Sequence, residues 1–140
     1  MIHIGIDPGT HTGLAVWDSG QERFLLLETL PIHKALDIVC KWQQDCKDRD
    51  VAMDVTFEDA RQRTWFGKGN VSAKMQGAGS VKRDCSIWED FLRDNGIPFW
   101  AKPPGKGMTK VTPDYFRMIS GYQGRTSEHA RDAAMLVIGR

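Results

Sequence analysis

Apolar and polar positions alternate at the start of the chain. Isoleucine stands at positions 2, 4 and 6, with histidine, glycine and aspartate at positions 3, 5 and 7. This period of two predicts a β-strand. The sequence PGTHTG over 8–13 predicts a turn, followed by a second strand over 14–17 and a third over 24–27. The chain is therefore expected to open with a three-stranded meander.

The remaining pattern alternates between helical and strand periods. The elements expected, in order, are a helix over 32–46, a strand over 51–58, a basic loop over 59–73, a helix from about 73 or 80 to 94, a strand over 97–101, a loop over 102–112, and a last helix capped by Ser127 or Thr126. The order βββαβαβα indicates an α/β fold, with a mixed five-stranded sheet flanked by helices.

The composition is that of an ordinary globular domain. The 140 residues fit a single domain over 1–140, with 41% hydrophobic and 26% charged residues. Three cysteines without CxxC spacing predict neither a disulfide framework nor a zinc knuckle. No apolar run approaches the roughly 20 residues of a membrane span, and the N-terminus lacks the basic start of a signal peptide. We therefore expect a soluble, cytoplasmic protein that does not bind membranes.

Charge is divided unevenly along the chain. Residues 1–60 contain 5 Lys or Arg against 11 Asp or Glu, whereas residues 61–140 contain 14 against 7. Residues 61–83 hold six basic residues and no acidic one. Such a segment is typical of proteins with a polyanionic partner, although solvated basic loops give the same count.

A possible acidic site combines the ends of two strands with the last helix. Asp7 and Glu58 each end a predicted strand, and parallel neighbours would bring their carboxylates to one sheet edge. His129 and Asp132 are spaced i, i+3 and share a helix face, as do Glu128 and Asp132 at i, i+4. Donors converging in this way suit one or two hard divalent cations. Taken singly, each is more typical of a turn residue, a solvent-facing carboxylate or a surface histidine than of a metal ligand.

Three segments carry a resemblance to a known family. The sequences IGIDPGTHTGLAVW, VTFEDARQR and SEHARDAAMLV, in this order, resemble the ribonuclease H-like superfamily, and within it the RuvC type of Holliday-junction resolvase, which includes small phage-encoded versions. The resemblance implies a ribonuclease H-like fold and a catalytic and metal-binding quartet of Asp7, Glu58, His129 and Asp132. It also implies cleavage of four-way or related branched DNA by a homodimer that uses Mg2+ or Mn2+, in a bacterial cell or a phage-infected host.

The mechanism we expect is two-metal hydrolysis of a phosphodiester. Asp7 would bridge two ions, Glu58 and Asp132 would each hold one, and His129 would be a ligand or orient the attacking water, with Glu128 as a rival for its place. The residues expected to bind nucleic acid are Arg61, Arg63, Trp65, Phe66, Lys68, Lys74, Lys82, Arg83, Lys102, Lys106 and Lys110. Trp65 and Phe66 would stack on unpaired bases, or else pack under their own loop.

Other functions fit parts of the pattern. A nuclease of the same fold could act on RNA–DNA hybrids or flaps. A non-catalytic nucleic-acid module is a further possibility, but without a metal its acidic residues would only repel phosphate. An ATP-binding protein of the actin and sugar-kinase type needs a second domain, so no nucleotide cofactor is expected. A dimer surface is expected on the helix near 80–95, whose apolar residues exceed one stripe unless all pack inside the monomer: Ile87, Trp88, Phe91 and Leu92.

Overall fold

The computed structural model of the chain describes residues 1–64, 71–105 and 110–140, with the backbone alone for residues 71–76 and 78. Its elements are β1 (Ile2–Asp7), β2 (His11–Asp18), β3 (Arg23–Pro31), α1 (Ile32–Asp48), β4 (Met53–Glu58), η1 (Ala60–Gln62), α2 (Val71–Asp94), β5 (Phe99–Lys102), α3 (Pro113–Ser120) and α4 (Glu128–Met135). None of the described helices is long and apolar enough to cross a membrane.

The described strands form one mixed sheet in the order β3-β2-β1-β4-β5. The first three strands are antiparallel neighbours, as expected of a meander. β4 returns beside β1 and runs parallel to it, and β5 runs parallel to β4. The expectation of an α/β fold with a five-stranded mixed sheet is confirmed.

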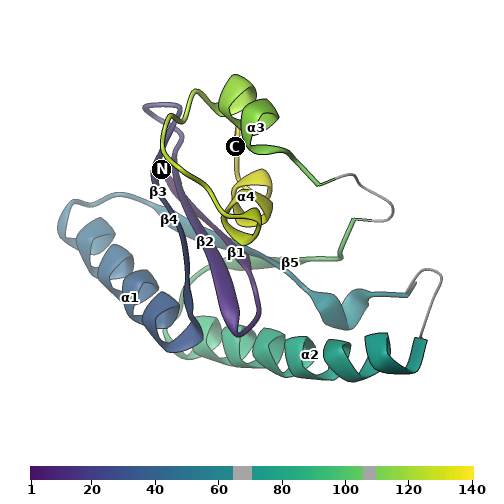
Figure 1. Ribbon diagram of the computed structural model, residues 1–140. Coiled ribbons are helices and arrows are strands. Elements are labelled where there is room, and N and C mark those ends of the chain that lie inside the picture. The colour runs from purple at the N-terminus through teal and green to yellow at the C-terminus, as the bar shows by residue number, and fades with distance from the viewer. Residues whose placement is uncertain (65–70, 106–109) are drawn as a thin grey trace.

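Helices cover both faces of the sheet (Figure 1). On one face α1 and α2 pack on the isoleucines of β1, with Val39 and Trp88 among the fully buried residues. On the other face α3 and α4 cover β1, β2 and β3, around Trp17 and Phe116. The residues of β1 from Ile2 to Ile6 are all buried. The isoleucines at the even positions face one helical layer, and the odd positions face the other.

α4 lies unusually close to the sheet because glycines face it. A Cβ atom added to Gly5 would lie 2.0 Å from the carbonyl oxygen of Ala133, and one added to Gly13 would lie 2.0 Å from that of His129. On the helix side, Ala130, Ala133 and Ala134 are buried. Small residues on both sides therefore let the backbone of α4 rest on β1 and β2.

Several boundaries differ from the sequence-based expectations. β2 begins at His11, inside the expected turn, and β3 continues to Pro31. The expected loop over 59–73 contains η1 and the first turn of α2. In each case backbone pairing or helix propagation extends the element past the point where the apolar pattern stops.

α3 was not predicted. Its boundaries follow standard rules: the Thr112 hydroxyl accepts a hydrogen bond from the Tyr115 amide, Pro113 occupies the first turn, and Gly121 ends the helix with φ 68°. The interior gives a weaker signal, because Phe116 is its buried residue while Tyr115 and Met118 are exposed. The order βββαβαβα therefore gains a helix before the last one.

Candidate metal centre

The sheet brings Asp7 and Glu58 to the same edge. Asp7 is the last residue of β1 and Glu58 the last of β4, and the two strands are parallel neighbours in which Ile6 pairs with Phe57. The predicted placement of both carboxylates at this edge is confirmed. Both residues are partly buried, and α4 packs against β1, the strand that carries Asp7.

α4 adds a histidine and an aspartate to this edge. His129 Nδ1 lies 2.9 Å from Asp7 Oδ2. One possible ligand atom from each of Asp7, His129 and Asp132 lies within 4.8 Å of the others. Glu58 is outside this group of three. Of the two rivals on α4, His129 joins the group, and the Glu128 side chain is 58% exposed beside it.

Burial and mutual repulsion act on the two strand carboxylates. Burial raises the pKa of Asp7, the hydrogen bond from His129 opposes this, and the charge of Asp132 raises the pKa further. Burial also raises the pKa of Glu58, and the charges of Asp7 and Asp132 add to the increase. Two carboxyl groups whose pKa values are raised in this way are stabilised in their charged form by a nearby positive charge.

Lys110 supplies positive charge to this cluster. Its ammonium contacts Asp132 Oδ2 and lies 3.7 Å from Glu128 Oε1. Burial alone would lower the pKa of Lys110, but the hydrogen bond to Asp132 and the charges of Asp7 and Glu128 raise it. The lysine was expected to bind nucleic acid, and the structure places it against the candidate metal ligands.

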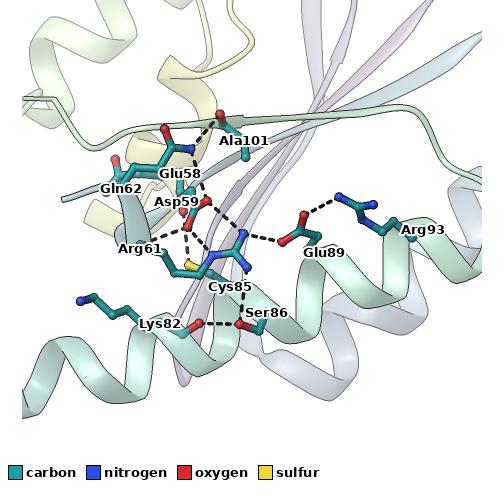
Figure 2. Close-up of polar contacts among 10 residues, drawn as sticks. All are labelled: Glu58, Asp59, Arg61, Gln62, Lys82, Cys85, Ser86, Glu89, Arg93 and Ala101. Atoms are coloured by element: carbon teal, nitrogen blue, oxygen red, sulfur yellow. Dashed lines mark hydrogen bonds and ion pairs between the residues drawn. The ribbon is translucent and has the colours of Figure 1, made fainter.

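A second polar network holds the backbone next to Glu58 (Figure 2). Asp59, which is 4% exposed, accepts hydrogen bonds from Arg61 Nε at 2.8 Å and Nη2 at 3.0 Å. Arg61 Nη2 also lies 2.6 Å from Glu89 Oε2 on α2. Burial alone would raise the pKa of Asp59, but the hydrogen bonds from Arg61 and Gln62 outweigh it and lower the pKa.

This network makes Arg61 a link between β4 and α2. Its guanidinium binds two carboxylates and lies 3.5 Å from the Ser86 hydroxyl, so most of its donors are occupied by protein groups. Glu58 itself is held through its backbone: the buried Cys85 thiol lies 3.6 Å from its carbonyl oxygen. No local pattern in the sequence indicates this link, because Asp59 and Glu89 are thirty residues apart.

Arg131 is a second residue whose role the sequence did not reveal. Its side chain is buried at the start of α4 and donates to the carbonyl oxygens of Val111 at 2.8 Å and Thr126 at 2.8 Å. These bonds fix the segments that lead into α4 and that carry Lys110. Arg131 therefore orients both the helix with His129 and the lysine opposite it.

The other residues expected to bind nucleic acid fall into three groups. Trp65, Phe66, Lys68 and Lys106 lie outside the described residues, and only the backbone of Lys74 is described. Lys82 and Arg83 lie on α2, and Arg83 Nε is 3.8 Å from Asp84 Oδ1. Lys102 ends β5 directly opposite Glu58 in the sheet register, and Arg63 is exposed five residues beyond Glu58.

A cavity of about 300 Å3 lies between α3 and the segment that leads into α4. Arg117, Tyr122, Arg125 and Thr126 are among its lining residues. Arg117 has one weak acidic neighbour, Asp114 at 3.9 Å. Two arginines beside an aromatic ring are suited to a phosphate and a base, and the sequence-based list of binding residues did not include them.

Comparison with known proteins yields no match: no family model, no curated protein and no solved structure is significantly similar to this chain. The fold and the site define an α/β protein with a mixed five-stranded sheet and a cluster of two aspartates and a histidine at one sheet edge.

Proposed function

We propose that the chain is a metal-dependent endonuclease of the ribonuclease H-like, RuvC-type class, which cleaves four-way or related branched DNA. The observation that carries this proposal is the convergence of Asp7, His129 and Asp132 within 4.8 Å, with Glu58 beside Asp7 at the same sheet edge. These are the four residues that the resemblance assigns to catalysis. They come from two strands and a helix that are separated by up to 125 residues in sequence.

The donor set fits a hard divalent cation. Ligand atoms of one Mg2+, each bound at about 2.1 Å, lie about 3 to 4 Å apart, which small side-chain rotations from the observed spacing would allow. Carboxylate oxygens suit Mg2+ and Mn2+, and the raised pKa values of Asp7 and Glu58 favour a site that gains from a cation. When bound, such ions would activate a water and stabilise the charge that develops on the phosphate.

The protein's own residues have separable tasks in this proposal. Asp7, Glu58 and Asp132 would hold the cations, with Asp7 central because it lies next to Glu58, His129 and Asp132. His129 donates its Nδ1 proton to Asp7 in the neutral tautomer, which leaves the Nε2 lone pair for a ligand bond or for the attacking water. The Asp59–Arg61–Glu89 network and Arg131 hold the two sides of the site in position.

Basic residues around the edge would bind the DNA backbone. Lys102 and Arg63 lie near Glu58, and Arg117 and Arg125 line the cavity near the start of α4. Contacts with phosphates give affinity and orientation but little sequence information, and they make binding sensitive to salt. A homodimer with two such edges would place paired nicks on a two-fold symmetric junction.

The test is cleavage of labelled four-way junction, duplex, RNA–DNA hybrid and flap substrates, with Mg2+, with Mn2+ and with EDTA. We expect metal-dependent cleavage of the junction, abolished in Asp7→Asn without loss of junction binding. Preferential cleavage of the hybrid or flap would assign a different substrate to the same chemistry. Junction binding without cleavage in either metal would support the non-catalytic module instead.

A further inference from the structure

The candidate metal centre already contains a cation, the ammonium of Lys110. It contacts Asp132, one of the three residues that come within 4.8 Å of one another, and lies 3.7 Å from Glu128. The Asp132 side chain is only 16% exposed, whereas that of Lys110 is 63% exposed. The acceptor is therefore fixed in the site, while the lysine approaches from solvent on a long side chain.

A lysine ammonium and a divalent ion compete for the same carboxylate oxygen. Asp132 Oδ2 accepts the lysine's hydrogen bond, so a cation at this oxygen must displace the ammonium or share it against charge repulsion.

We propose that Lys110 is an internal competitor for the metal at Asp132, so that full metal loading requires the lysine to move from Asp132 to a phosphate of the bound DNA. The inference rests on the proposed function for the metal and goes beyond it in assigning a switching role to Lys110. Its side chain is 63% exposed, and its backbone lies next to Val111, whose carbonyl oxygen is bound by Arg131. Metal binding and DNA binding would then favour each other.

The expected size of the competition follows from the ion pair. A pair with an exposed lysine contributes up to about 1 kcal/mol, which corresponds to about a fivefold change in a dissociation constant. The cation must overcome this pair before it binds Asp132. Removing the ammonium should therefore tighten metal binding about fivefold in the absence of DNA.

The experiment is titration of the DNA-free protein with Mn2+, with free Mn2+ measured by electron paramagnetic resonance. Lys110→Met should bind Mn2+ about fivefold more tightly than the wild type, and Lys110→Arg, which keeps the charge, should bind it as weakly as the wild type. Lys41→Met is the matched control: it removes the same charge from α1, on the opposite face of the sheet, and should leave the affinity unchanged.

A second readout follows Lys110 directly. In protein whose lysines carry 13C-labelled methyl groups, the resonance that is missing from Lys110→Arg should shift when diamagnetic Mg2+ is added without DNA. Equal Mn2+ affinity of Lys110→Met and wild type, or no Mg2+-dependent shift, would overturn the competition and leave the nuclease proposal standing. Failure of both proteins to bind Mn2+ at millimolar concentration would overturn the metal site and the competition together.

Discussion

The closeness of α4 to the sheet can be tested by a single methyl group. Gly13 faces the first turn of α4, and a Cβ atom at this position would lie 2.0 Å from the carbonyl oxygen of His129 and 3.1 Å from the amide nitrogen of Ala130. Ordinary contacts of this kind begin near 3.4 Å. In Gly13→Ala the helix must therefore retreat from β2 by about 1.4 Å, because a backbone carbonyl cannot rotate away as a side chain can.

This retreat has a cost in stability and a cost in geometry. Overpacking against a rigid backbone costs about 3 kcal/mol, which for a domain of this size lowers the melting temperature by about 10 °C. The same shift adds up to about 1.4 Å to the 2.9 Å separation of His129 Nδ1 and Asp7 Oδ2, which takes the pair toward or beyond hydrogen-bond range. Mn2+ affinity should fall together with stability.

Gly79→Ala is the matched control for this change. Gly79 is exposed on α2, and a Cβ atom added there meets nothing within 4 Å. Alanine inside a helix is favoured over glycine by about 0.5 to 1 kcal/mol, so this variant should melt a few degrees higher than the wild type. Thermal unfolding followed by circular dichroism compares the two. A Gly13→Ala protein that melts with the wild type or with Gly79→Ala would refute the close packing of α4 on β2.

Three further variants test other parts of the site. Because the folded state raises the pKa of Asp7, the contribution of Asp7 to stability is full below about pH 4 and is lost as the pH rises through the folded-state pKa. Asp7→Asn should therefore raise the melting temperature at pH 7 in EDTA. An unchanged melting temperature would contradict the raised pKa of Asp7. Arg61→Ala should cost about 2 to 3 kcal/mol in urea unfolding, because it leaves a buried carboxylate without its partner, whereas Arg93→Ala, which removes an exposed i, i+4 pair, should cost about 0.3 kcal/mol; equal costs would contradict the link. His129→Ala should lose far more cleavage activity than Glu128→Ala in both Mg2+ and Mn2+, and the reverse order would assign the third position to Glu128.

The parts of the fold that sequence predicted are those with a regular local period. The isoleucines of β1 and the alternating residues of β4 define strands and faces, and the strand ends then locate Asp7 and Glu58. Pattern was sufficient here because each feature depends on neighbours within one element.

The parts that sequence did not predict depend on contacts between distant segments. Arg61 was expected to bind phosphate because it begins a basic run. In the structure its partners include Glu89, which lies on α2. Lys110 likewise contacts Asp132, twenty-two residues away, and Arg131 binds the carbonyl oxygen of Val111, the neighbour of Lys110. A basic run records charge but not which acidic group lies opposite, and only the packed structure decides that.

The same reasoning applies to the dimer surface expected on α2. Trp88 and Leu92 are fully buried and belong to the core, and Phe91 packs against Trp88 with ring centroids 5.8 Å apart. Ile87, at 39% exposure, is the member of this set that remains accessible. The dimer stays a prediction, and sedimentation at micromolar concentration tests it. An Ile87→Glu variant should weaken self-association if α2 forms the interface.

The two ends of the parallel strands β1 and β4 differ in the charged groups that they carry. At their N-terminal end, His3 Nδ1 lies 2.8 Å from Asp54 Oδ1, and Arg140 lies 2.6 Å from the Thr56 hydroxyl and 3.8 Å from Asp54. That end carries one carboxylate, with a histidine and an arginine beside it. The C-terminal end carries Asp7, Glu58 and Asp132, with His129 and Lys110 against them and Lys102 opposite Glu58 in the sheet register. Burial raises the pKa of Asp7 and of Glu58. Since both ends lie under the same layer, packing alone does not require unbalanced charge at either. The three carboxylates at the C-terminal end are those to which the proposed function assigns the cations.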